Sequence, residues 1–247
     1  MSAIYETDKL LAEYLLFHYG SAEETLPSQV ALAPGMSDAL DFASRTARLF
    51  GEKEVERGLD LGCAVGRSTF EMARSCRSIV GMDFSARFIQ AAEGLRTEGQ
   101  VAYRRLDEAR LSTPLMARMP AGIDPKRVRF MVGDAMDLPD DIGVFDRVHA
   151  ANLLCRLREP LRLLTRLPDL VVDGGELVLV TPCTWLEEFT PQENWPSGST
   201  LDWLRDQLEP AFILKSTSEE PFLIRETARK FQWTCSLASI WQRQSAH

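Results

Sequence analysis

The sequence predicts an α/β protein, with a mostly parallel β-sheet and helices on both of its faces. Three segments carry this prediction. Residues 58–70 begin apolar, turn at two glycines and continue into a helical pattern. Residues 80–85 end a short apolar run at Asp83, and residues 128–137 end a β-rich run in Gly133-Asp134-Ala135. Apolar runs that alternate with helical patterns are typical of parallel strands joined by crossover helices.

The order of elements fits one domain, 1–247, with a seven-stranded sheet whose last strand is antiparallel. Strands are expected at 57–61, 78–82, 128–132, 145–150, 176–181, 211–217 and 231–241. Helical spacing of apolar residues predicts helices at 4–19, 38–50, 86–97, 161–170 and 199–209. Residues 1–55 would form an N-terminal helical lid and 56–247 the core. The insertion near 98–127 is expected to form an extra helix and a loop.

The glycine turn indicates the kind of cofactor. It follows the pattern Asp60-x-Gly62-x-Ala64-x-Gly66 rather than Gly-x-Gly-x-x-Gly. An acid at the end of the first strand would repel a pyrophosphate, so the pattern disfavours an NAD oxidoreductase. The same carboxylate suits S-adenosylmethionine, which carries an ammonium and a sulfonium and no phosphate. Taken alone, the turn also fits a tight βα connection without a ligand.

Together the three motifs resemble those of class I S-adenosylmethionine-dependent methyltransferases, which have a Rossmann-like sheet. The resemblance implies that the glycine turn lines the methionine part of the cofactor and that Asp83 receives the ribose hydroxyls. It places Asp134 on the adenine amino group and Ala135 beside the base. From the three motifs it assigns these cofactor residues: Asp60, Gly62, Cys63, Gly66, Asp83, Phe84, Asp134 and Ala135. Alanine at position 64, where many members have glycine, is a mild departure.

Composition narrows the partners and the compartment. The chain has 247 residues, a net charge of −8 and a pI near 5.1, which disfavours nucleic acid and favours a small-molecule substrate. Its five cysteines form no Cys-x-x-Cys pair, and with three histidines they predict reduced thiols and no metal site. The sequence has no basic leader and no apolar run of membrane length. We therefore expect a cytoplasmic enzyme that does not bind membranes.

A closer resemblance covers nearly the whole chain. Segments 59–68, 83–89, 150–154, 184–191 and 224–231 are similar to the methyltransferases of the ovothiol pathway, and the last two are the most specific. The resemblance implies methylation of a ring nitrogen of 5-thiohistidine. Members often form the C-terminal domain of a sulfoxide synthase. Because the iron-binding synthase portion is absent from this sequence, we expect a stand-alone methyltransferase that pairs functionally with a separate synthase.

Several side chains are candidates for binding the acceptor. Asn152, just past the fourth strand, would orient it and also touch the cofactor. Glu187 and Glu188 would hold its amino or imidazole group, with Trp185 stacked on the ring. The alternative for these three is an exposed acidic turn beside a core tryptophan. Arg225 would clamp the substrate carboxylate, because guanidinium pairs with carboxylate bidentately; the alternative is a surface ion pair.

The predicted first helix contributes a second group of candidates. Tyr14 and His18 would contact the acceptor, Tyr19 the cofactor, and Arg45 the cofactor carboxylate. His18 could accept a proton. As alternatives, Tyr14 packs, His18 caps the helix and Arg45 lies on the surface. His149, on the fourth strand, is expected to be a core residue without a catalytic role.

Other acceptors fit the same motifs. The nearest is 5-selenohistidine, followed by a different small molecule. From another class, a cofactor-binding module that has lost catalysis would bind S-adenosylmethionine without turnover. The specific segments 184–191 and 224–231 favour the enzyme, because a binding module needs no constructed acceptor site. The choice of ring nitrogen, the need for a general base and the oligomeric state are left open.

Overall fold

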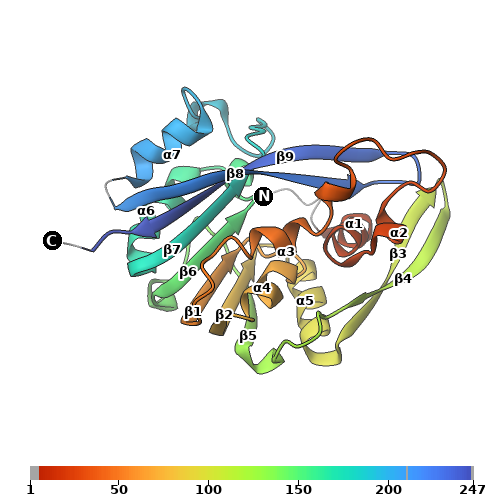
Figure 1. Cartoon of the computed structure of the whole chain (residues 1–247), viewed down its shortest axis with the longest axis horizontal. Helices are drawn as coiled ribbons and strands as arrows, with labels where there is room; N and C mark the ends of the chain where they lie inside the picture. The colour runs from red at the N-terminus through yellow and green to blue at the C-terminus, as the bar shows by residue number, and fades with distance from the viewer. Residues whose placement is uncertain (1–5, 210, 246–247) are drawn as a thin grey trace.

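The computed structural model describes residues 6–209 and 211–245 and confirms the α/β fold (Figure 1). Within this part of the chain, seven strands form one sheet in the order β5-β2-β1-β6-β7-β9-β8. The strands are β1 (Val55–Leu61), β2 (Cys76–Asp83), β5 (Val128–Val132), β6 (Phe145–Ala151), β7 (Val171–Thr181), β8 (Phe212–Arg225) and β9 (Phe231–Arg243). The first five are parallel, and β9 runs antiparallel to both β7 and β8. The expected antiparallel last strand is thus confirmed.

Helices cover both faces of the sheet. The α-helices are α1 (Asp8–Tyr19), α2 (Ala22–Thr25), α3 (Phe42–Thr46), α4 (Arg67–Met72), α5 (Ala86–Glu98), α6 (Pro160–Leu170) and α7 (Thr200–Leu208). The 3₁₀ turns are η2 (Ser37–Ala39), η3 (Pro125–Arg127), η4 (Asp140–Ile142), η5 (Leu154–Arg156) and η6 (Gln192–Asn194). The helix expected at 38–50 is shorter, because its first turn is 3₁₀. The helix expected at 4–19 begins at Asp8, and residues 4 and 5 lie outside the described part.

The sheet separates two hydrophobic cores, because side chains alternate between its faces. Along β7, Val178 and Val180 face the core formed with α1, α3, α4 and α5. Leu177 and Leu179 face the core formed with α6, α7 and Trp241 of β9. Strand β7 is buried on both faces, which explains why its sequence is a continuous apolar run rather than an alternating one.

The insertion at 98–127 differs from the expectation. Instead of a helix it forms an antiparallel ribbon, β3 (Gln100–Glu108) and β4 (Leu111–Arg118). The reason is that burial alternates from one residue to the next along these strands. Tyr103 and Ala117 are buried, while their neighbours Arg104 and Arg118 are exposed. A helix would spread these apolar residues over all its faces.

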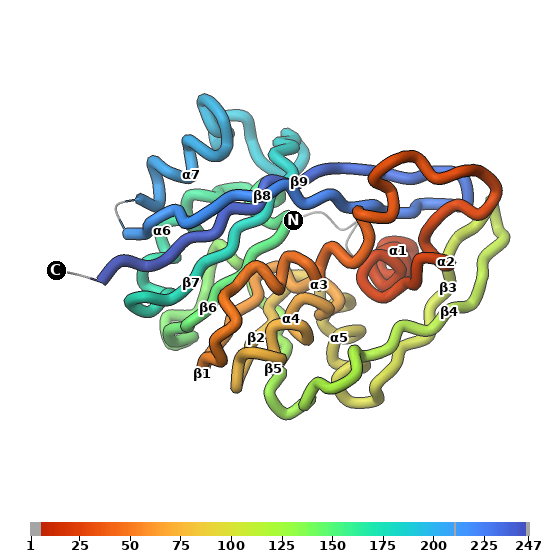
Figure 2. The backbone as a smooth tube through the Cα atoms, viewed as in Figure 1, coloured from red at the N-terminus to blue at the C-terminus, as the bar shows by residue number. Residues whose placement is uncertain are grey.

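The C-terminal ribbon is also longer than expected. Strand β8 continues through Pro221 to Arg225, whereas the sequence predicted a strand only at 211–217. Proline is tolerated here because β8 is the edge strand of the sheet. Figure 2 shows the β8–β9 ribbon running past the sheet and above α1, with the β3–β4 ribbon on the other side of that helix. Helix α1 is therefore enclosed between two ribbons.

Candidate active site

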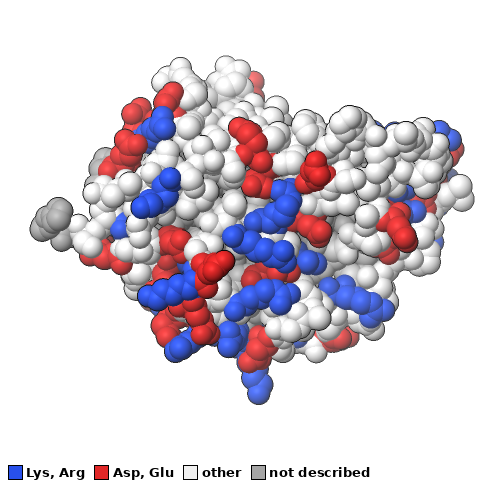
Figure 3. Space-filling model, in the orientation of Figure 1, with Lys and Arg blue, Asp and Glu red and all other residues white. Residues whose placement is uncertain are grey.

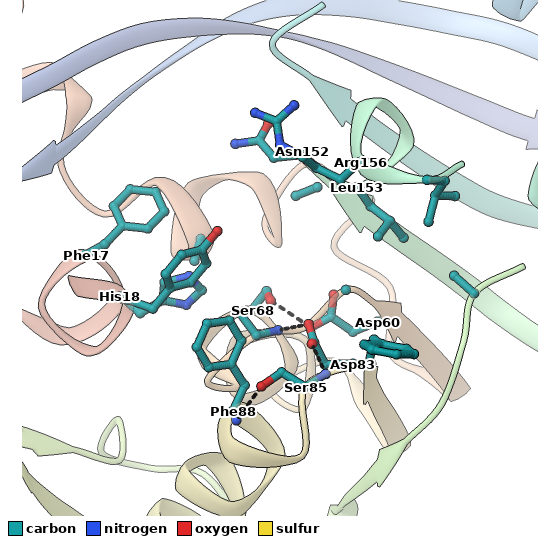
Figure 4. Close-up of a pocket in the computed structure, with 18 of the residues that line it drawn as sticks. Phe17, His18, Asp60, Ser68, Asp83, Ser85, Phe88, Asn152, Leu153 and Arg156 are labelled. Atoms are coloured by element: carbon teal, nitrogen blue, oxygen red, sulfur yellow. Dashed lines mark hydrogen bonds between the residues drawn. The ribbon is translucent and has the colours of Figure 1, made fainter. Parts of the chain in front are cut away.

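A cavity of about 500 Å³ lies between the glycine turn, helix α1 and the loop that follows β6. Residues just past three parallel strands reach it: Gly62 after β1, Asp83 at the end of β2, and Asn152 after β6. The carboxyl edge of an open parallel sheet is where such folds bind ligands. Figure 4 shows Phe17 and His18 on one side of this space, with Asn152 and Arg156 facing Asp83 across it.

The glycine turn has the left-handed backbone that its sequence predicts. Gly62 has φ +70° and Gly66 has φ +85°, and Gly66 starts helix α4. A Cβ at Gly66 would lie only 2.6 Å from the ring of Phe130, so no other residue fits. Ala64 also has a positive φ, and its N–H donates to Asp83 Oδ2 at 2.9 Å. This bond ties the turn to the end of β2.

Asp60 is the centre of a buried hydrogen-bond network beneath the turn. Its Oδ2 accepts from the hydroxyls of Ser68 and Thr69, each at 2.6 Å, and its Oδ1 lies 2.8 Å from His149 Nδ1. Both Asp60 and His149 line the cavity wall, and His149 Nε2 has no partner in the described residues. The carboxylate therefore holds strand β1, helix α4 and strand β6 together, in addition to facing the cavity. His149 is buried, as expected, but it also belongs to the site.

Asp83 presents a carboxylate to the cavity with both oxygens already oriented. Oδ1 accepts from the Ser85 N–H and Oδ2 from the Ala64 N–H, each at 2.9 Å. Burial raises the pKa of Asp83 to about 6, and the two N–H donors lower it only in part. Each oxygen keeps a lone pair for a further donor. The arrangement suits a pair of hydroxyl groups on a ligand.

Cofactor affinity should therefore depend on pH. If the two ribose hydroxyls donate to Asp83, as the resemblance implies, they favour its ionised form, and binding lowers the pKa of this group from about 6. Affinity is then highest above pH 6 and falls as the pH drops below it, with Kd rising by up to about tenfold per pH unit. Isothermal titration with S-adenosylhomocysteine between pH 5 and 8 measures this. The Asp83→Asn variant should bind S-adenosylhomocysteine weakly, and its affinity should show no change near pH 6. The same pH dependence in this variant as in the wild type would contradict the placement of the ribose at Asp83.

The side of the cavity under α1 is aromatic. Phe17, Phe42 and Phe222 pack with ring centroids 5.0–5.9 Å apart. His18 stacks on Tyr14, and its Nδ1 has no hydrogen-bond partner among the described residues. Burial, together with the nearby charge of Arg67, lowers the pKa of His18 to about 3, so the imidazole is neutral at pH 7. The lid thus supplies an aromatic wall with one uncharged hydrogen-bond acceptor.

Most of the residues predicted to touch ligands lie together at this cavity. They are Tyr14, His18, Asp60, Gly62, Asp83, Phe84, Ala135, Asn152 and Glu188. Asn152 has a left-handed backbone with φ +53°, and its Oδ1 accepts from Ser236 at 2.8 Å. Its Nδ2 has no acceptor among the described residues and is available to a ligand.

The other predicted residues have partners elsewhere. Cys63 and Gly66 form the turn behind the lining, and Asp134 accepts from the Met136 N–H. The Tyr19 hydroxyl donates to the Val65 carbonyl at 2.8 Å, and Arg45 pairs with Glu220. The remaining three are Trp185, which donates to Thr200 and packs on Trp203; Glu187, which accepts from Gln192; and Arg225.

Arg225 is enclosed rather than directed at the cavity. Its Nη1 donates to the carbonyls of Glu24 at 3.0 Å and of Thr25 and Leu26 at 3.4 Å, and its Nη2 lies 3.6 Å from Asp107 Oδ1. The surface ion pair that we considered is not formed either. These contacts belong to the anchoring of the lid and not to a ligand carboxylate.

Sequence reasoning missed several lining residues, among them Phe17, Ser85, Phe88, Phe42, His149, Arg156, Phe189 and Phe222. Ser85 carried a signal, because it follows Asp83 and caps α5 by accepting from the Phe88 N–H. For Arg156 the signal was weaker: this residue lies four positions after Asn152, in the loop beyond β6. The phenylalanines come from distant segments that only the tertiary structure brings together.

The donor set near the turn fits S-adenosylmethionine. Acids and hydroxyls line this end, and the two arginines of the lining, Arg156 and Arg158, come from the loop after β6. A carboxylate set for a hydroxyl pair, with no arginine or lysine among the lining residues of the glycine turn, suits a ribose and a cationic group better than a pyrophosphate.

Comparisons with known proteins agree with this assignment. The N-methyltransferase NodS from Bradyrhizobium japonicum, solved with S-adenosyl-L-homocysteine, has a TM-score of 0.55 and 15% identity, covering 95% of this chain and 99% of that chain. YcgJ from Bacillus subtilis has a TM-score of 0.55 and 12% identity, covering 83% and 99%. A protein solved in work on thioacetal formation during echinomycin biosynthesis has a TM-score of 0.54 and 17% identity, covering 96% and 93%. At these identities the likeness shows the fold. Among curated proteins no sequence matches significantly.

Fold and site together define a class I methyltransferase whose cofactor is S-adenosylmethionine. The model of the methyltransferase domain family matches residues 36–217, and the chain belongs to that family. No helix in the described ranges, 6–209 and 211–245, is long and apolar enough to cross a membrane. On the face drawn in Figure 3, acidic and basic side chains are interspersed rather than segregated.

Proposed function

We propose that this protein methylates a ring nitrogen of 5-thiohistidine, the product being ovothiol. The observation that supports this most strongly is the place of the two segments that resemble ovothiol-pathway enzymes. Segment 184–191 contributes Glu188 and Phe189 to the cavity, and segment 224–231 contributes Ile224. The two segments are far apart in sequence and border the same space as helix α1. A separate sulfoxide synthase would supply the acceptor.

The residues of the chain would perform three tasks. Asp83, the glycine turn and Ala135 would hold the cofactor, which supplies an electrophilic methyl group on its sulfonium. The aromatic wall of Phe17, Phe42 and Phe222 excludes water from the reacting atoms. Asn152 Nδ2 would donate a hydrogen bond to the acceptor and fix its orientation, which is the main requirement of an in-line transfer.

Ring nitrogen must be favoured over the softer thiolate of the acceptor. Orientation decides this choice, because both nucleophiles belong to one rigid ring. The neutral His18 offers a ring nitrogen that can accept a hydrogen bond from the ring N–H of the acceptor and so help to orient it. With a pKa of about 3, His18 is a weak base and serves as a hydrogen-bond acceptor first.

Turnover of 5-thiohistidine tests the proposal. Purified protein with S-adenosylmethionine and 5-thiohistidine should form S-adenosylhomocysteine and one N-methylated product, identified by mass spectrometry and proton NMR. Histidine should be a poor acceptor, and 5-selenohistidine in direct competition measures the preference for sulfur. S-methylation, or turnover of only the seleno compound, would contradict the proposal. Tight cofactor binding with no turnover of any acceptor would favour the non-catalytic binding module.

A further inference from the structure

The positive charge of the cavity is confined to one loop. Among its lining residues the arginines or lysines are Arg156 and Arg158, which follow β6, and the acids at the turn are Asp60 and Asp83. One more acid of the lining, the exposed Glu188, precedes Phe189, over whose ring Arg156 lies. Arg156 and Glu188 therefore carry opposite charges on neighbouring parts of the cavity lining.

Arg156 is held in place while part of its guanidinium is unused. Its Nη1 donates to the carbonyls of Cys155 and Thr184, each at 3.1 Å, and its guanidinium lies over the ring of Phe189, 4.7 Å from the centroid. Nε and Nη2 donate to no residue in 6–209 or 211–245, and no acid there pairs with this arginine. Figure 4 shows Arg156 beside Asn152 at the far side of the cavity from Asp83. A fork of free donors on a fixed guanidinium matches a carboxylate.

The neighbouring segment keeps this loop rigid. Thr190 is fully buried and donates from Oγ1 to the Leu157 carbonyl at 2.7 Å. Asn194 Nδ2 donates to the Arg158 carbonyl at 2.8 Å. With the bond from Arg156 to the Thr184 carbonyl, three hydrogen bonds join segment 184–195 to the loop after β6. The segment that resembles the ovothiol enzymes therefore positions Arg156 as well as presenting Glu188.

We infer that Arg156 and Glu188 bind the zwitterionic end of an α-amino acid acceptor. Arg156 binds its carboxylate, and Glu188 binds its ammonium group. Arg156 thereby replaces Arg225 as the residue that selects for the carboxylate. The inference rests on the proposed function and adds to it the residues that decide specificity. Glu188 makes no ion pair with any described residue, so its charge is available to the acceptor.

Two acceptors that differ in one group test the assignment. The first is 5-thiohistidine, and the second is its decarboxylated amine, which keeps the ring and the ammonium. Arg156→Gln should lower kcat/KM for the amino acid by about 10- to 100-fold, mainly through KM, and change that for the amine by less than about threefold. Arg162→Gln, on the exposed face of α6, is the matched control and should change neither. Affinity for S-adenosylhomocysteine should be unchanged in both variants.

The outcomes separate this inference from the proposed function. Equal losses for both acceptors, or no loss for the amino acid, would overturn the role of Arg156 and leave the function standing. Binding to the S-adenosylhomocysteine-loaded protein, measured by titration calorimetry with histidine and with histamine, needs no turnover. If 5-thiohistidine is not methylated but Arg156→Gln still removes the preference for histidine over histamine, only the proposed function fails. If histidine and histamine bind equally or not at all to the wild type, the inference fails.

Discussion

Asp60→Ala is expected to lower the free energy of unfolding by about 3–5 kcal/mol and to abolish measurable cofactor binding. The carboxylate is 1% exposed and accepts from Ser68, Thr69 and His149. Removing it leaves three donors buried without an acceptor and releases the glycine turn from β6. Chemical denaturation followed by circular dichroism measures the first effect, and calorimetry with S-adenosylhomocysteine the second.

A milder variant keeps this prediction testable if Asp60→Ala does not fold. Thr69→Val removes one of the three donors and should cost about 1 kcal/mol while cofactor binding survives. Asp141→Ala, at an exposed site away from the cavity, is the control and should cost less than about 0.5 kcal/mol. A loss below 1 kcal/mol for Asp60→Ala would show that the network does not depend on this carboxylate.

Arg225→Ala is expected to release the lid. Arg225 and Arg105 both donate to the Glu24 carbonyl at the end of α2, at 3.0 and 2.7 Å. Asp107 accepts from Arg105 and Thr113, and its carbonyl accepts from the Ala228 N–H at 2.9 Å. These contacts join the tips of the two ribbons around the α1–α2 turn. Without Arg225 the carbonyls of Glu24, Thr25 and Leu26, the second of them buried, lose a charged donor, which costs about 2–3 kcal/mol.

The consequence for activity follows from the position of α1. Because α1 carries Tyr14, Phe17 and His18, a looser lid should lower kcat/KM by about 10- to 100-fold. Limited proteolysis should cut within 21–36 faster than in the wild type. Arg225→Lys keeps the charge but not the fork of donors, so its kcat/KM and its rate of proteolysis should lie between those of the wild type and Arg225→Ala. Arg229→Ala, on the exposed connection between β8 and β9, is the control. If Arg225→Ala loses activity but is cut at the same rate as the wild type, Arg225 instead contacts the acceptor directly.

The two ribbons also show where prediction from sequence stopped. The parallel strands and the glycine turn were predictable, because apolar runs, glycines and an acid at a strand end are local signals. The β3–β4 ribbon was mistaken for a helix, since its buried face consists of few residues such as Tyr103 and Ala117. Pro221 concealed the continuation of β8, because its tolerance depends on β8 being an edge strand.

By itself the sequence determined the fold class and the cofactor. Both follow from short segments whose chemistry is complete in itself, such as Asp60, the glycine turn and Asp83. Only the tertiary structure decided which arginine faces the acceptor. Arg225 meets carbonyls about 200 positions away in the chain, and Arg156 keeps free donors because the segment from 184 to 195 holds it. The partners of a charged side chain come from segments distant in sequence, so the spacing of that residue from its sequence neighbours does not predict them.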